Sequence, residues 1–393
     1  MIEPIHLGLT DADFFIRNMK KKETTINGYA ASMSAKATNE KTQWTKYHSP
    51  KGGHGFAAED TNAFFERIKG HKVVVVGIDN AKNGADLLID GVPVQLKYCK
   101  NAYSSIEACF EGGTFRYYGQ RIMVPQDQYE EAIICLKNKI AEGKVPGVSN
   151  PDDAIKMIKK GQLTYRQALK IKKVGTKESL TFDIATQAQV AGFIGGISAG
   201  FAFYSAKKEG LSNKEASLSA AKEFGKSGGK ILVSGVATQQ FLRSEAGRKV
   251  AAITTHVVRK GINGACDTNV GRNVIEKFSQ GVCGKMVNGS AARTIATKAI
   301  RGNIITSAVV FAVDSIPDTY RLCTGKMSAK EFGRSRAAGA AGVAGGSAGY
   351  MAGMAIGTAI CPGVGTAIGG FVGGMLGGIV GNNGVKKVFN KLN

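Results

Sequence analysis

The spacing of apolar and polar residues predicts a mixed N-terminal region followed by a long helical region. Apolar residues recur at helical spacing over 56–68, and Gly70 ends that segment. Residues 71–78, HKVVVVGI, predict a buried strand because consecutive valines suit the interior of a sheet. A hairpin is predicted over 84–98 and an amphipathic helix over 124–143. Helix, strand, hairpin and helix together are typical of a compact α/β domain.

The C-terminal region contains a long segment without charge. Residues 337–385 carry no Asp, Glu, Lys or Arg, and glycine recurs there at every fourth position in two runs. Every fourth residue of a helix lies nearly on one face, so each run forms a groove that a second helix backbone can approach closely. The segment 361–363, Cys-Pro-Gly, predicts a turn that folds the runs into a hairpin. The glycines concerned are Gly345, Gly349, Gly353, Gly357, Gly365, Gly369, Gly373 and Gly377.

This glycine content favours a membrane environment. Each glycine costs a helix in water roughly 1 kcal/mol relative to alanine, whereas lipid forces the backbone to satisfy its hydrogen bonds internally. The alternative is a tightly packed hairpin at the core of a soluble domain. Residues 184–206 also lack charge and are long enough to span a bilayer, whereas 303–313 are too few to span alone. The basic tail, 386–391, suits anionic headgroups.

Composition adds two constraints. Lys and Arg number 52 against 30 Asp and Glu, a formal charge of +22, which indicates either an anionic partner or a purely solubilising role. The expected anionic partners are DNA and membrane lipid. The seven cysteines are scattered and form no CxxC pair, which argues against a disulfide framework or a zinc site and favours a reducing compartment. The first residues show no secretory signal pattern.

The predicted hairpin places polar residues together. Asp90-Gly91 favours a two-residue turn, and closing the hairpin there sets Asp86 opposite Gln95. Because strand residues alternate in facing, Gln95 and Lys97 share one face. A carboxylate, an amide oxygen and waters suit Mg²⁺, and Lys97 could orient an attacking water or stabilise developing negative charge. The alternative is a solvated hairpin edge without chemistry.

The order Asp86, then Gln95-Leu96-Lys97, resembles the acid-then-QxK signature of Mrr-like members of the PD-(D/E)xK nuclease superfamily. The resemblance implies a restriction-endonuclease-like α/β fold, DNA as substrate and Mg²⁺ (or Mn²⁺) as cofactor. It further implies a principal metal ligand at Asp86, the second signature position at Gln95 and a catalytic lysine at Lys97. Accessory metal ligands would be Glu59, on the preceding helix, and the backbone carbonyl of Leu96.

Two further groups are candidates for nucleic-acid contact. Residues 111–121, EGGTFRYYGQR, interleave aromatic and basic side chains, as a DNA-contacting loop does. The residues concerned are Arg116, Tyr117, Tyr118 and Arg121, with ordinary packing as the alternative. His54, five residues before Glu59, could contact a phosphate or be an ordinary loop histidine.

The predicted organisation has five parts. They are a polar lead segment (1–50), the α/β domain (51–148), a basic helical connector (149–180), a partly apolar helical region (181–332) and the glycine-zipper hairpin with its tail (333–393). The fold class is therefore α/β followed by an all-α, Gly/Ala-rich, membrane-associated region.

The sequence leaves several functions open. The first is a metal-dependent nuclease held at, or delivered across, a bacterial membrane; the expected location is the inner membrane, with the nuclease domain in the cytoplasm. It would act in phage defence or as an antibacterial toxin with an immunity or delivery partner. The second is a membrane-perturbing or pore-forming protein whose α/β domain is a recognition module. The third is a non-catalytic membrane protein that tethers DNA. In each, the GxxxG faces favour helix pairing, including pairing between copies of the chain.

Overall fold

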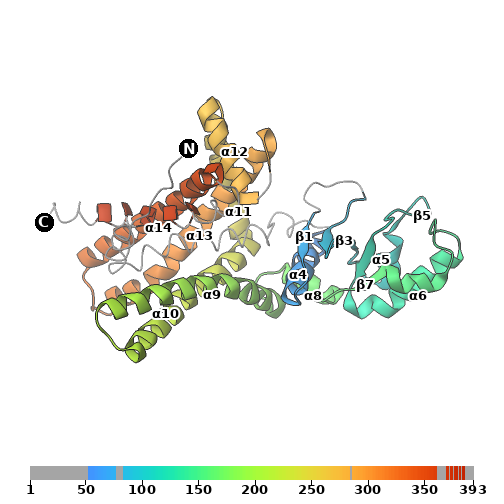
Figure 1. The fold of residues 1–393 in the computed structure, drawn as a ribbon, viewed down its shortest axis with the longest axis horizontal. Coiled ribbons are helices and arrows are strands. Elements are labelled where there is room, and N and C mark those ends of the chain that lie inside the picture. The colour runs from blue at the N-terminus through green and yellow to red at the C-terminus, as the bar shows by residue number, and fades with distance from the viewer. Residues whose placement is uncertain are drawn as a thin grey trace, which may run out of the picture. The chain divides into compact units, whose positions relative to one another are not determined.

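The computed structural model describes residues 52–76, 83–283 and 286–360, and residues 369–385 except 371, 375, 379 and 382. The predicted lead segment, 1–50, lies outside the described residues. The described chain forms two compact units that divide between Phe182 and Asp183. Figure 1 shows an α/β unit followed by a helical unit, as the apolar pattern predicts.

The α/β unit is built on a five-stranded mixed sheet of order β1-β2-β3-β6-β7. Its N-terminal half is antiparallel, from β1 to β3, and its other half is parallel, from β3 to β7. A parallel pair needs a crossover between its strands, and short helices supply it here. The strands are β1 (Val73–Val75), β2 (Leu87–Ile89), β3 (Val92–Leu96), β6 (Arg121–Val124) and β7 (Ile158–Lys160).

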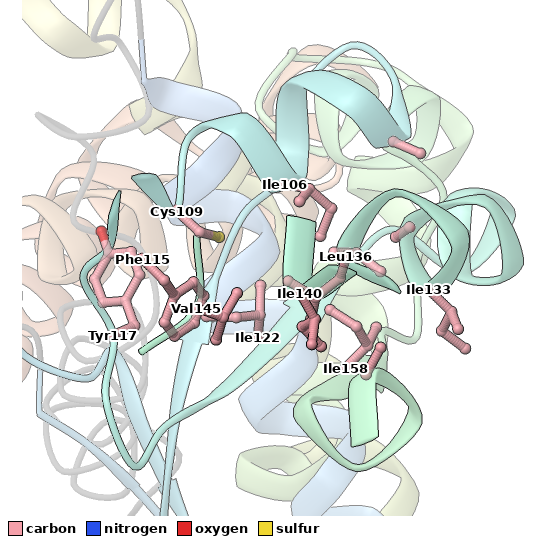
Figure 2. Close-up of a cluster of buried hydrophobic side chains, with 14 residues drawn as sticks. Ile106, Cys109, Phe115, Tyr117, Ile122, Ile133, Leu136, Ile140, Val145 and Ile158 are labelled. Atoms are coloured by element: carbon pink, nitrogen blue, oxygen red, sulfur yellow. The ribbon is translucent and has the colours of Figure 1, made fainter. Parts of the chain in front are cut away.

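One apolar cluster joins the parallel half of the sheet to its helices (Figure 2). Leu136, on helix α6 (Tyr129–Ala141), packs with Ile122 and Ile158 of the sheet, and all three side chains are fully buried. Ile106 joins the cluster from α5 (Ala102–Glu107). The cluster positions strand β3 by holding its parallel neighbour β6. The small sheet of β4 (Phe110–Glu111) and β5 (Thr114–Phe115) lies in the connection between α5 and β6.

Helix α4 (Gly53–Ile68) precedes the sheet and buries a face that includes Ala57, Ala58 and Phe64. This confirms the helix predicted over 56–68, with its start three residues earlier. Strand β1 is shorter than the predicted 71–78, and residues 77–82 lie outside the described part of the chain.

The predicted connector, 149–180, contributes to the sheet. It contains η3 (Pro151–Asp153), α7 (Ala154–Met157), β7 and α8 (Tyr165–Ile171). Thr164 caps α8 in a reciprocal capping box with Gln167. Strand β7 was not predicted, because three residues are too few to show a period. It forms because pairing with β6 satisfies its backbone and buries Ile158.

The helical unit consists of long helices. Ser212 caps α10 in a capping box with Glu215, and Ser244 caps α11 through the backbone N–H of Gly247. One apolar cluster joins Ile194, Ile231 and Met354 from three different helices. The helices are α9 (Lys177–Lys208), α10 (Asn213–Arg243), α11 (Glu245–Ala265), α12 (Asn269–Cys283), α13 (Gly289–Cys323) and α14 (Ala329–Ile360).

Helix α13 corrects one expectation. Residues 303–313 are too short to span a membrane alone, but they lie inside a continuous helix of 35 residues. Within the described residues, α13 is the one helix that is long and apolar enough to cross a membrane. Of its most apolar 18-residue segment, 33% is buried in the protein. A core helix of a soluble protein would be mostly buried. The predicted span at 184–206 lies within α9, which does not meet the same criterion.

The two glycine runs pack against each other in antiparallel register. A Cβ placed on Gly353 would lie 1.9 Å from the carbonyl oxygen of Gly369, and one on Gly345 would lie 2.2 Å from that of Gly377. Only glycine permits this approach, which confirms the predicted hairpin packing. Gly357 takes part through its Cα, 3.1 Å from the Cβ position of Gly369. Gly365 and the predicted turn at 361–363 lie outside the described residues.

Candidate functional site

The β2–β3 turn has the predicted conformation. Asp90 and Gly91 both have positive φ, 51° and 83°, and Ile89 pairs with Val92 across the turn. The Asp90 carboxylate contacts His71 Nδ1 at 2.7 Å and accepts the Lys72 backbone N–H at 2.8 Å. These contacts, that of His71 foremost, lower the pKa of Asp90. Asp90 therefore ties the turn to the segment before β1.

The Asp86 side chain contacts Gln95, as predicted, but the paired register of β2 with β3 ends at Leu87 opposite Val94. The Asp86 backbone N–H donates to Val94 O at 3.0 Å, so Asp86 lies just outside the regular pairing. Its Oδ2 accepts from Gln95 Nε2 at 2.6 Å and from the backbone N–H of Leu96 at 2.7 Å. Gln95 is 7% exposed, so this carboxylate–amide pair is held against the protein interior.

Lys97 lies just after β3 and is held by the parallel half of the sheet. Its backbone N–H donates to Met123 O at 2.9 Å. Its Nζ lies 4.6 Å from the centroid of the Tyr117 ring, a cation–π contact. The side chain is thus drawn toward the loop before β6, and Tyr117 determines where its charge sits.

Of the predicted metal ligands, only Asp86 has an oxygen that could bind Mg²⁺ without a change in the hairpin. Glu59 lies half-buried on α4, and the described residues contain no group of three or more His, Cys, Asp or Glu able to hold a metal. Mg²⁺ often binds through one or two carboxylates and keeps several waters, which Asp86 alone can satisfy. Gln95 presents its NH₂ to Asp86, so its amide must turn over before its oxygen can face a cation. Leu96 uses its N–H, not its carbonyl, toward Asp86.

Most of the predicted DNA-contacting side chains of residues 111–121 contact the protein itself. Tyr117 is 4% exposed and belongs to the core cluster, so it cannot stack on a base, which corrects that expectation. Arg116 donates to Ala108 O at 3.1 Å, and Arg121 donates to Ile158 O at 3.0 Å. Tyr118 is 57% exposed and remains accessible. In this loop Phe115 and Tyr117 pack inward, and the guanidinium groups of the two arginines donate to backbone carbonyls.

His54 is held by the fold. Its Nε2 lies 2.9 Å from Tyr98 O, and its ring meets Tyr165 edge-on at 5.2 Å between centroids. Burial lowers the pKa of His54, and the nearby charge of Lys172 acts in the same direction. These contacts assign it to packing between the start of α4, the end of β3 and α8.

A buried acid was missed by sequence reasoning. Glu66, on α4, is 1% exposed; its Oε1 accepts from Gln162 Nε2 at 2.8 Å and its Oε2 lies 3.3 Å from Lys159 Nζ. His71 Nε2 approaches the same Oε2 at 3.8 Å. The two closest partners follow Glu66 by more than 90 residues, so no local pattern could have revealed the cluster.

Two parts of the chain match known families. Residues 35–141 match the YeeR C-terminal domain, and residues 334–384 match the C13G5.2-like, glycine zipper domain. The inner membrane protein YeeR of Escherichia coli (strain K12) is 43% identical over 115 residues, which are 28% of this chain and 22% of that protein. The chain therefore matches about a fifth of the length of this relative. No solved structure matches.

These matches correct the resemblance to the PD-(D/E)xK superfamily. The family found over the α/β region is the YeeR C-terminal domain and not a nuclease family, so that resemblance is wrong. A short acid-then-QxK pattern recurs by chance in hairpins, because polar residues alternate with apolar ones in any half-buried strand. The glycine-zipper prediction is confirmed by the second match. Together with the likeness to an inner membrane protein, it supports a membrane-associated protein.

Proposed function

We propose that the chain is an inner-membrane protein whose helical unit inserts into the bilayer and perturbs its permeability. In this proposal the α/β unit is a recognition module presented at the membrane surface. The observation that carries the proposal is the orientation of side chains on α13. Support also comes from the inner-membrane relative and from the glycine-zipper packing.

Helix α13 buries several polar side chains and exposes two large isoleucines, while Ile305 and Val310 are also buried. Arg301, Asn303 and Thr306 are each at most 7% exposed, and the Arg301 guanidinium donates to Thr255 Oγ1 on α11 at 3.2 Å. Ile304 and Ile316 are 47% and 62% exposed. In water this arrangement would leave apolar area unburied, whereas in lipid the apolar side chains are solvated and the polar ones find partners inside the bundle.

The glycine zipper supplies a means of association that works in lipid. Hydrophobic burial does not drive helices together there, because lipid tails are as apolar as the side chains. Close backbone approach increases van der Waals contact instead. The approach of Gly349 to Gly373, with a Cβ position 2.0 Å from the opposite carbonyl oxygen, is of this type.

Two measurements test this function on the full chain. Insertion predicts that the protein floats with liposomes and resists extraction by alkaline carbonate. Perturbation predicts leakage of an entrapped dye, which Gly349→Val should reduce strongly, because the new side chain separates the zipper helices. Gly333→Val is the matched control, since a Cβ at Gly333 of α14 meets nothing within 4 Å.

The outcomes separate the two parts of the proposal. Insertion without leakage would overturn membrane perturbation and leave an anchored protein. Equal leakage from Gly349→Val and the parent chain would show that the zipper is not the active part. Absence from floated liposomes would overturn the proposal as a whole.

A second candidate function is phosphodiester hydrolysis of DNA at the hairpin, supported by the contact of Asp86 with Gln95 and by the position of Lys97 two residues after Gln95. Asp86 would hold Mg²⁺ or Mn²⁺, joined by Gln95 after its amide turned over. The bound ion would supply charge balance and an activated water. Lys97 would then stabilise negative charge on the phosphate. Phage defence or antibacterial toxicity would be the biological setting, and an immunity or delivery partner would accompany the toxin.

The hairpin chemistry is tested by plasmid cleavage with the full chain, with Mg²⁺ and with EDTA. Metal-dependent cutting that disappears in both Asp86→Asn and Lys97→Gln would support it. Lys72→Gln is the control: it removes one positive charge, as Lys97→Gln does, but at a lysine outside the hairpin. Cutting that survives both site substitutions would show that the activity lies elsewhere, and absence of cutting would remove this candidate.

A further inference from the structure

Helix α11 carries two apolar faces, of which one is buried. Ala251, Val258 and Ile262 face the protein and are at most 8% exposed. The second face bears Val250, Ile253 and Val257, which are 41%, 67% and 63% exposed. Spacings of three and four residues place these side chains in one stripe along the helix. We call Val250, Ile253 and Val257 the α11 stripe.

Lysines border the α11 stripe. Lys249 lies one turn before Ile253, and Lys260 lies two turns after it, so both flank the same side of the helix. Lys249 pairs with Glu245 at 3.2 Å, but the two side chains are 72% and 69% exposed. An ion pair this exposed contributes little to folding stability and leaves the lysine accessible to another anion. Lysines beside apolar side chains can lay their aliphatic stems on the apolar surface and extend the charged group toward headgroups.

From this arrangement we infer that α11 lies on an anionic lipid surface, with the α11 stripe in the acyl boundary and Lys249 and Lys260 at the headgroups. The inference rests on the proposed insertion of the helical unit and adds the lipid chemistry and the segment that recognises it. An exposed apolar stripe bordered by basic residues is the pattern of helices that lie in the membrane interface. The positive charge of Lys249 and Lys260 favours an anionic lipid surface as the binding partner of the α11 stripe, because a neutral apolar partner would gain nothing from the lysines.

The opposite exposed side of α11 provides an internal control. Ala252 is exposed and shares its side of the helix with Arg248 and His256, one turn away in each direction. It carries no large apolar side chain. If α11 lies on a membrane through the α11 stripe, position 257 should enter lipid while position 252 remains in water.

The test uses tryptophan fluorescence in the full chain. Trp44, the single tryptophan, is replaced by Phe, and Val257→Trp or Ala252→Trp is introduced. Each protein is floated with phosphatidylcholine vesicles, with or without phosphatidylglycerol, that carry brominated acyl chains. We expect strong bromine quenching of the tryptophan at 257 in the anionic vesicles and little at 252. Lys249→Gln and Lys260→Gln should each weaken the anionic component of binding about five-fold, equivalent to about 1 kcal/mol.

Three results would contradict the inference or the insertion on which it rests. A chain that floats with vesicles but shows no quenching at 257 overturns the inference and leaves insertion standing; a protein partner for the α11 stripe would give this result. Equal quenching in neutral and anionic vesicles, unaffected by the lysine substitutions, overturns the anionic preference. A chain that floats with neither vesicle overturns both the insertion and the inference.

Discussion

Gly349 and Gly373 meet backbone to backbone. A Cβ on Gly349 would lie 2.0 Å from Gly373 O, and one on Gly373 would lie 2.2 Å from Gly349 O. The contact is reciprocal and recurs one turn away in each direction. The packing of the two runs therefore depends on the absence of side chains where Gly345, Gly349 and Gly353 meet Gly377, Gly373 and Gly369.

Adding one methyl group at this contact should separate the helices. We expect Gly349→Ala to lower the free energy of unfolding in detergent by roughly 1–3 kcal/mol, the usual cost of overpacking. Gly333→Ala in the same helix meets open space and should instead raise it by up to about 1 kcal/mol, through helix propensity. Thermal unfolding in micelles measures both. A similar effect of the two substitutions would contradict the role of the contact.

The ion pair between Asp183 and Arg243 should be sensitive to the loss of one partner. Both side chains are at most 2% exposed, and Gln240 also donates to the same carboxylate oxygen, at 2.7 Å. Removing one member leaves a buried charge, so Asp183→Leu should destabilise the helical unit by about 3–5 kcal/mol. The double variant Asp183→Leu, Arg243→Met should recover most of that loss. A double variant as unstable as the single one would show that the pair is not the cause.

The carboxylate of Asp86 should control the order of β3. Its Oδ2 accepts the Leu96 N–H at 2.7 Å, and Leu96 is 7% exposed. Asp86→Ala leaves this buried donor unsatisfied at a cost of about 1–3 kcal/mol. We expect faster hydrogen exchange at the Leu96 amide, measured by mass spectrometry of the full chain. Asp86→Asn keeps an acceptor and should exchange at an intermediate rate; unchanged exchange in Asp86→Ala would contradict the assignment.

The turn contact of Asp90 should be lost in acid. Because its folded-state pKa is lowered, its contribution is present above the unfolded value and disappears as pH falls through the folded value. The hairpin should therefore loosen below about pH 4, the ordinary range of an aspartate. Hydrogen exchange of β2 and β3 measured across this range should show the change. In Asp90→Asn the acid-dependent part should be absent, and its persistence would place the effect on another group.

Thiol reactivity should separate two cysteines. Burial raises the pKa of Cys109 to about 12, and its side chain is 1% exposed, whereas Cys323 is exposed. Only the thiolate reacts with iodoacetamide, so Cys323 should be alkylated rapidly in the folded chain and Cys109 only after unfolding. Mass spectrometry of timed samples checks this. Rapid native labelling of Cys109 would show that the core cluster opens.

The sequence alone determined the features that depend on local spacing. Asp90-Gly91 fixed the turn, and the two-residue period then set the pairing of β2 with β3 that brings the Asp86 side chain to Gln95. The four-residue glycine period fixed which faces of the C-terminal helices meet. In each case the interacting groups lie within one turn, one hairpin or one repeated helix face.

Tertiary structure decided the features whose partners lie far apart in the chain. Strand β7 exists because β6 offers it a backbone partner, and Glu66 is buried because Lys159 and Gln162 reach it from the same segment. Tyr117 is an aromatic residue of the kind that stacks on DNA bases, yet its ring is buried in the core cluster. The Lys97 ammonium group lies over that ring. Whether an apolar side chain on α13 is buried or exposed likewise depends on the other helices. Burial is a property of the whole packing arrangement, and short-range spacing does not encode it.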